Sequence, residues 1–130
     1  MGSEMCIRDR EWNPEGYRRL LKHGAVDVVQ MDPGRCLGIT GCVKVVPLIE
    51  AQNIQFSAHT WSSALNTAAS VHLLASSTHG AAMDFKPHTS PMQHELVSDP
   101  WVQEDGYLEV RESPGLGVTV DQSVVEKYAF

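Results

Sequence analysis

The sequence predicts an α/β fold, a partial TIM-type (β/α) barrel in which parallel strands alternate with helices. Three short apolar segments each run directly into an ionisable side chain: 26–31 into Asp32, 54–58 into His59, and 81–83 into Asp84. These side chains lie 27 and 25 residues apart, a length that holds a strand, a loop, a helix and a second loop. Because such folds place their chemistry at the carboxyl ends of the strands, the pattern predicts an enzyme site.

The length of the chain limits how much of a barrel it can form. The chain has 130 residues, whereas a closed barrel of eight βα units takes roughly 250. We therefore expect only some of the units of a barrel. No apolar run approaches the roughly 20 residues that span a bilayer, so we expect no membrane partner.

Charge and cysteine content exclude further classes of protein. The formal net charge is −6, and the only basic cluster is Arg18 with Arg19, so we expect no nucleic-acid partner. The cysteines Cys6, Cys36 and Cys42 are odd in number and lack CxxC spacing, which argues against a disulfide framework and against a zinc site. We expect a cytoplasmic protein.

Residues 1–10 are expected to be a leader that is foreign to the fold. Residues 5–10 resemble the translation of an adapter sequence used to build sequencing libraries, and residues 1–10 hold no signal-peptide apolar core. We therefore predict that residues 11–130 are the carboxyl-terminal fragment of a barrel domain whose coding sequence continues upstream. A native disordered leader is the alternative.

The elements from residue 11 onward follow a βα order. In order they are a helix from Pro14 to Gly24, a strand over 26–31, a loop over 32–41, a helix from Thr40 to about Gln52, a strand over 54–58, a helix over 62–75 and a strand over 81–85. Thr40 is the predicted N-cap of its helix. Pro47 lacks a backbone donor, so we expect a kink or a late helix start there.

The residues after the last strand are expected to form a return segment that covers the end of the barrel. A short element is expected near 93–97, and the alternation of 106–110 predicts an edge strand. The glycines and proline of 114–117 predict a turn, and Asp121 is the predicted cap of a final helix that ends near Tyr128.

Several of these segments together resemble the carboxyl-terminal part of the mandelate racemase and muconate lactonizing branch of the enolase superfamily. They are 32–41, 56–61 with the Ala-rich helix that follows, 105–107 and 114–118. The resemblance covers nearly all of 11–130. It implies that the chain begins near the fifth strand of an enolase-like barrel and contains the sixth, seventh and eighth strands with the return segment. It also implies that the capping domain and three carboxylates that bind Mg²⁺ belong to a longer parent protein.

The resemblance implies a role for each candidate residue. His59 matches the general base that removes the proton alpha to a substrate carboxylate, and Asp32 matches the aspartate that hydrogen-bonds this imidazole. Asp84 stands where many members carry a glutamate that hydrogen-bonds the developing enolate, and its side chain is one methylene shorter. Arg35 lies near a position where members often carry a basic residue. Trp61 lies two residues after the base and is a candidate to line the substrate pocket, with a packing role as the alternative. No metal ligand is expected within this chain.

The implied activity is that of a Mg²⁺-dependent enzyme that enolises a carboxylate substrate. A sugar-acid dehydratase is the first expectation, with a small sugar acid as the partner and a homo-oligomeric parent. A racemase or epimerase of the same superfamily is the close alternative, and a non-catalytic fragment that lacks the metal site is the other. Whichever of these holds for the parent, we expect the chain as given to be inactive. A phosphate-binding half-barrel is disfavoured because no glycine-rich loop joins a strand to a basic helix start.

Each candidate also has a purely structural interpretation. Asp32 precedes a proline and could simply form a turn, His59 could cap a loop, and Asp84 could be a solvated loop carboxylate. His72 lies on the apolar stripe of its helix and is expected to be a packing residue. The irregular spacing of the remaining histidines downstream fits no metal pattern: they are His79, His88 and His94.

Overall fold

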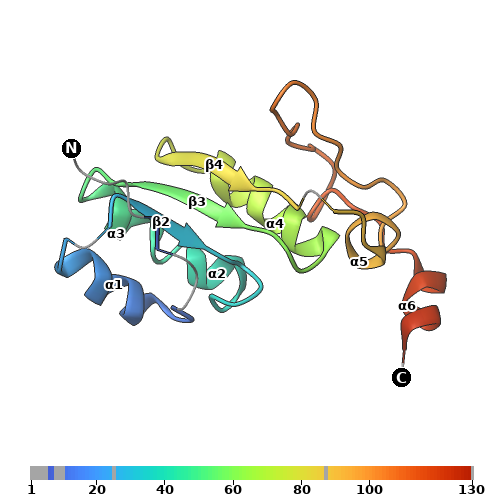
Figure 1. Ribbon diagram of the computed structural model, residues 1–130, viewed down its shortest axis with the longest axis horizontal. Helices are drawn as coiled ribbons and strands as arrows, with labels where there is room; N and C mark the ends of the chain where they lie inside the picture. Colours follow the sequence, from blue (N-terminus) through green and yellow to red (C-terminus); the bar gives the residue numbers. More distant parts are fainter. Residues whose placement is uncertain (1–5, 8–10, 25, 87, 130) are drawn as a thin grey trace.

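A parallel sheet lies at the centre of the computed structural model, which describes residues 6–7, 11–24, 26–86 and 88–129 (Figure 1). Its strands are neighbours in chain order: β1 (Cys6–Ile7), β2 (Val28–Met31), β3 (Gln55–His59) and β4 (Gly80–Asp84). Each neighbouring pair is parallel. Successive βα units produce this order, and the strands predicted at 26–31, 54–58 and 81–85 are confirmed to within two residues at each end.

Strand β1 lies within the leader that sequence reasoning set aside. Cys6 pairs with Val28, and Ile7 pairs with Val29. Of residues 1–10, only these two are described, so most of the predicted leader lies outside the described residues. Its foreign origin stays a prediction, as does the domain start at residue 11.

Helix α1 (Pro14–Lys22) forms where it was predicted and packs against the sheet. The side chain of Asn13 accepts a hydrogen bond from the backbone N–H of Gly16, and Pro14 occupies the first turn, where its missing N–H costs nothing. Tyr17 is buried, and its hydroxyl donates to the backbone oxygen of Gln30 over 3.2 Å. The helix ends at Lys22, His23 is its C-cap, and Gly24 follows with a φ of +57°.

The single helix predicted from Thr40 to Gln52 is wrong, because two short helices occupy that stretch. They are α2 (Gly38–Cys42) and α3 (Val46–Glu50). Leu37, with a φ of 56°, precedes α2 and supplies no side-chain cap, so Thr40 lies inside the helix instead of capping it. Pro47 falls in the first turn of α3, which is the late helix start that its missing donor favours.

The main apolar core lies between these helices and one face of the sheet. Val29, Met31 and Phe56 extend from β2 and β3 into this core and are 2% exposed or less. Side chains of the helices and of the loops beside them fill the rest: Tyr17, Leu21, Cys36, Cys42, Val45, Val46, Ile49 and Leu73. Side chains along β2 and β3 point alternately to the two faces of the sheet, so Gln30 and Ser57 face away from this core. Asp32 and His59, two residues further along each strand, lie on the same face as Gln30 and Ser57.

Helix α4 (Ala64–Ala75) packs against β3 and β4. Ser63 caps it by accepting a hydrogen bond from the backbone N–H of Asn66 over 3.4 Å. The prediction of a helix over 62–75 is therefore confirmed apart from its first two residues. His72 is half-buried, and its Nε2 lies 3.4 Å from the backbone oxygen of Leu116, as expected of a hydrogen-bonded packing residue.

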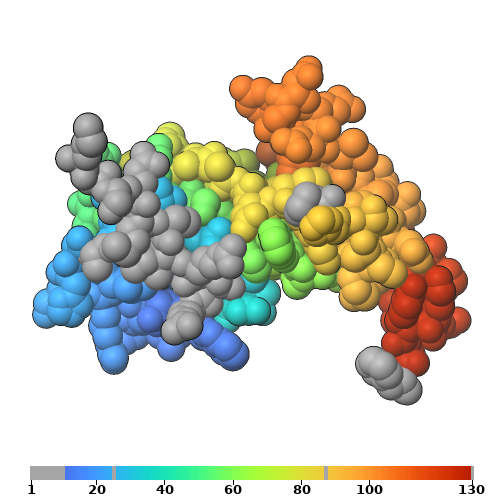
Figure 2. Space-filling view, in the orientation of Figure 1, coloured from blue at the N-terminus to red at the C-terminus, as the bar shows by residue number. Residues whose placement is uncertain are grey.

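The segment after β4 is mostly irregular and contains α5 (Pro91–His94) and α6 (Gln122–Tyr128). The edge strand predicted over 106–110 is wrong. Asp105 and Gly106 both have positive φ and form a tight turn, so the backbone pairs only at an isolated bridge between Glu104 and Tyr107. Figure 2 shows α6 at one end of the molecule, far from α1. Asp121 caps α6 as predicted.

Candidate active site

The carboxyl ends of β2 and β3 bring Asp32 and His59 together. The parallel register pairs Met31 with Ala58, so the residues that follow them, Asp32 and His59, lie side by side. His59 Nδ1 lies 3.0 Å from Asp32 Oδ2. The contact joins residues 27 positions apart in sequence, as the strand spacing predicted. The catalytic roles of the pair stay predictions.

The Asp32 carboxylate is buried and hydrogen-bonded at both oxygens. Asp32 is 2% exposed. Its Oδ1 accepts from the backbone N–H of Gly34 over 2.8 Å and from Asn66 Nδ2 over 2.9 Å, which leaves Oδ2 to face His59. An ionised carboxylate only accepts hydrogen bonds, so in this contact the imidazole proton belongs on Nδ1. Nε2 is then the ring nitrogen that can take up a proton.

Trp61 connects His59 to the end of the next strand. The parallel register places Asp84 of β4 beside His59. The indole N–H of Trp61 donates to Asp84 Oδ1 over 3.1 Å, and the indole ring stacks on the imidazole of His59. The Thr60 hydroxyl also donates to the backbone oxygen of Asp84 over 2.8 Å. The three strand ends singled out in the sequence are therefore adjacent, although Asp84 reaches His59 through Trp61.

Arg35 lies at the edge of this group. Its Nε is 3.8 Å from Asp32 Oδ2, and its side chain is half exposed. The guanidinium thus stands beside the Asp32 and His59 pair and is accessible to solvent. Such a cation can receive a carboxylate from solution.

Asn66 belongs to the site but was missed by sequence reasoning. It lies in the first turn of α4, where its Nδ2 reaches both Asp32 Oδ1 and the backbone oxygen of His59. The sequence signal was an asparagine three residues after the capping Ser63, directly downstream of the strand that ends at His59. That signal is weak, because asparagine near a helix start is common.

The carboxylates near His59 do not form a metal centre. Across the described ranges, no group of three or more histidine, cysteine or acidic side chains is arranged to hold a metal ion. Both oxygens of Asp32 accept hydrogen bonds from N–H groups, and Oδ1 of Asp84 accepts from Trp61. Mg²⁺ takes oxygen ligands, and these N–H groups occupy the positions around the carboxylates that the ion would need.

Two cysteine thiols are buried in the loop and helix that follow Asp32. The Cys42 thiol donates to Cys36, which lowers the pKa of Cys36. The same hydrogen bond, together with burial, raises the pKa of Cys42. Both side chains belong to the apolar core, so they stabilise the position of the loop after Asp32.

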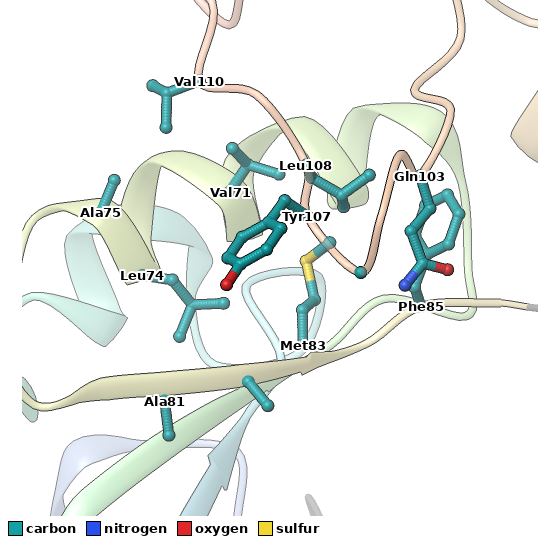
Figure 3. Close-up of a pocket in the computed structure, with 12 residues that line it drawn as sticks. Val71, Leu74, Ala75, Ala81, Met83, Phe85, Gln103, Tyr107, Leu108 and Val110 are labelled. Atoms are coloured by element: carbon teal, nitrogen blue, oxygen red, sulfur yellow. The ribbon is translucent and has the colours of Figure 1, made fainter.

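A cavity of about 500 Å³ lies away from the Asp32 and His59 pair. It is bounded by α4, β4 and the 103–110 segment, and Figure 3 shows Tyr107 and Leu108 projecting between the helix and the strand. Its lining is almost entirely apolar, and neither Asp32 nor His59 contributes to it. Among the described residues, its lining contains no carboxylate, imidazole or basic side chain.

The chain is similar in sequence to known proteins. A family model described as enolase C-terminal domain-like matches residues 3–124. D-xylonate dehydratase of Haloferax volcanii is 30% identical over 124 residues, which is 95% of this chain and 30% of the relative. D-gluconate dehydratase of Thermoproteus tenax is 34% identical over 109 residues, which is 83% of this chain and 22% of the relative.

A solved structure gives the same result. The mandelate racemase/muconate lactonizing enzyme from a marine actinobacterium, in complex with magnesium, superposes with a TM-score of 0.82 at 25% identity. The match covers 96% of this chain and 34% of that one. The chain thus spans between about a fifth and about a third of the length of these proteins. None of the helices in the described part of the chain is long and apolar enough to cross a bilayer.

Proposed function

Because the chain belongs to the enolase C-terminal domain-like family, in the mandelate racemase and muconate lactonizing branch of the enolase superfamily, we propose that it carries the general base of an enolising enzyme. The observation that carries the proposal is the 3.0 Å contact between His59 Nδ1 and Asp32 Oδ2 at neighbouring strand ends. The curated relatives compared above are dehydratases, and both act on sugar acids by name. We propose a sugar acid as the substrate of the whole protein.

The proposed step is transfer of the substrate's alpha proton to His59 Nε2. The bond between carbon and hydrogen breaks, its electron pair enters the enediolate, and the proton moves to the imidazole. Asp32 accepts the Nδ1–H, which holds the ring in the required tautomer and stabilises the imidazolium that forms. In a dehydratase the electron pair of the enediolate then forms a carbon–carbon double bond as the bond from the neighbouring carbon to its hydroxyl group breaks. The hydroxyl leaves as water with the proton that the His59 imidazolium gives up, and the resulting enol tautomerises to the 2-keto-3-deoxy acid.

Neighbouring residues are proposed to shape and charge the substrate site. Arg35 is proposed to receive the substrate carboxylate, because its half-exposed guanidinium lies beside Asp32, the partner of the base. Trp61 forms a wall of the site against His59. Asp84 is oriented by Trp61 and is proposed to hydrogen-bond the substrate.

Magnesium is proposed for the whole protein, with ligands outside this chain. Mg²⁺ in this superfamily stabilises the charge of the enediolate. Asp32 and Asp84 are already hydrogen-bonded to N–H donors, so no step proposed for these residues passes through the metal. The homo-oligomeric state and the cytoplasmic location expected of the parent stay predictions.

A product assay on the complete parent protein tests this function. We would incubate it with a panel of aldonic acids, including xylonate and gluconate, and detect 2-keto-3-deoxy acids. His59→Asn removes Nε2 and should lower turnover about a hundredfold or more, the contribution of a general base. His72→Asn is the matched control, since His72 contacts the backbone of Leu116 away from the site. Racemised substrate without keto acid would favour the racemase alternative, and turnover that survives His59→Asn would overturn the proposal.

A further inference from the structure

Asn66 spans the ends of the two strands that carry the proposed catalytic pair. Its Nδ2 donates to Oδ1 of Asp32 over 2.9 Å and to the backbone oxygen of His59 over 3.2 Å. A side-chain amide nitrogen has two hydrogens, so both donors of Asn66 are used. Both partners are acceptors, which settles the orientation of the amide, because the flipped group would place its oxygen against two other oxygens.

The effect of Asn66 on Asp32 follows from the two oxygens of the carboxylate. Oδ1 accepts from Asn66 and from the backbone N–H of Gly34, whereas Oδ2 faces His59. Two donors on one oxygen prevent the carboxylate from rotating about its bond to Cβ. The loop is closely packed here, since a Cβ at Gly34 would lie 3.1 Å from Oδ1 of both Asn66 and Asp32. Asp32 is therefore held from the side opposite to His59.

The requirements of the helix do not explain an asparagine at this position. Asparagine is a poor helix former, and Ser63 already caps α4. Asn66 is 6% exposed, and its Oδ1 is buried without a hydrogen-bond partner, which is a cost to the fold. The contacts that compensate for this cost are those to Asp32 and His59.

We propose that Asn66 is a positioning residue, which holds the Asp32 carboxylate so that His59 keeps its proton on Nδ1. The geometric part of this inference is independent of the reaction, and its consequence for turnover rests on the proposed function. The hydrogen bonds of Asn66 go to the Asp32 carboxylate and to the backbone oxygen of His59, so it acts through these two groups.

The test is ¹⁵N NMR of the His59 ring in the full 130-residue chain. In the unaltered chain we expect the Nδ1–H tautomer. Asn66→Leu keeps the size of the side chain but has no donor, and Asn66→Asp keeps its shape but turns a carboxylate toward Asp32. Both should shift His59 toward the Nε2–H tautomer or to a mixture of the two. Thr67→Val is the control. Thr67 is the next residue of α4, and its hydroxyl accepts a hydrogen bond from Gln93 Nε2 instead of contacting the Asp32 and His59 pair.

Two results would overturn the proposal. One is an unchanged His59 ring spectrum in folded Asn66 variants. The other is loss of the folded spectrum in both Asn66 variants while Thr67→Val stays folded, because Asn66 would then serve the fold and not the catalytic pair.

A kinetic arm separates this inference from the proposed function. In the complete parent protein, Asn66→Leu should lower kcat about tenfold, as expected for the loss of one charge-assisted hydrogen bond, with little change in KM. If the unaltered parent shows no turnover while the tautomer shift occurs, the proposed function fails and the positioning role stands. If the parent is active and Asn66→Leu matches it, the positioning role fails and the proposed function stands.

Discussion

The indole N–H of Trp61 donates to Oδ1 of Asp84 over 3.1 Å, while the ring of Trp61 stacks on His59 with 6.0 Å between ring centroids. Trp61 therefore joins the end of β3 to the end of β4. Asn66 joins the ends of β2 and β3 in the same way, through Asp32 and His59. His59 lies between these two connections.

Replacing Trp61 by phenylalanine tests the connection to Asp84. Trp61→Phe keeps an aromatic ring against His59 but removes the donor to Asp84. We expect kcat of the parent enzyme to fall about fivefold, the equivalent of about 1 kcal/mol for one hydrogen bond. Trp12→Phe, an exposed tryptophan before α1, is the control for steady-state kinetics. Equal kcat values in the two variants would show that Asp84 needs no orientation by Trp61.

Asp32→Asn should remove activity while largely preserving the fold. The donors of Gly34 and Asn66 would retain the amide oxygen at the position of Oδ1, so the new NH₂ group would face His59. His59 Nδ1 must then accept, which moves the ring proton to Nε2 and blocks the base. We expect kcat to fall about 10⁴-fold, as when the buried aspartate of a serine protease triad is replaced in the same way. The His59 ring spectrum and turnover, measured on the same variant, check both halves of this statement.

Phe56→Ala tests the core beneath the site. Phe56 is fully buried on β3, two residues before Ala58 and on the same face. We expect the free energy of unfolding to fall by about 3–5 kcal/mol, the usual cost of deleting a buried phenylalanine side chain. Val102→Ala, at a side chain that is 70% exposed, should change it by less than about 0.5 kcal/mol. Urea denaturation followed by circular dichroism measures both, and similar values would place Phe56 outside the core.

Asp121→Ala should loosen α6 in a pH-dependent way. The hydroxyl and then the backbone N–H of Ser123 donate to Asp121 and lower its pKa below the ordinary 3.8. Because the folded pKa is the lower one, the stabilisation is complete above the ordinary value and is lost as pH falls through the folded value. Amide hydrogen exchange of α6 should therefore be faster in the variant near neutral pH, and α6 should become equally mobile in both proteins at low pH. Equal exchange at neutral pH would exclude a capping role.

The parallel strands and the Asp32 and His59 contact could be predicted because they follow from local patterns and spacing. Each strand is a short apolar run, and parallel βα units of similar length must place their carboxyl ends side by side. Asp32 and His59 directly follow Met31 and Ala58, the last pair between β2 and β3, so their proximity follows from the register. The cap at Asp121 was predictable for a similar reason, since capping depends on only a few neighbouring residues.

The failures lie where tertiary contacts decide the backbone. Leu37 adopts a left-handed conformation that a leucine rarely takes, so the start of α2 could not be read from Thr40. The alternation at 106–110 reflects Leu108 packing toward Val71 and Trp101, not a strand partner. Asn66 escaped notice because its role depends on how closely α4 begins to the ends of two strands, which no local pattern records.

Incorporation of solvent deuterium at the alpha carbon tests the central claim most directly. The complete parent protein would be incubated in deuterated water with the sugar acid proposed as its substrate and followed by proton NMR. If His59 takes the alpha proton, deuterium should appear at the alpha carbon of recovered substrate with the unaltered enzyme and with His72→Asn, and its incorporation should cease with His59→Asn. Incorporation that continues at the original rate in His59→Asn would contradict the account, because another group would then remove the proton.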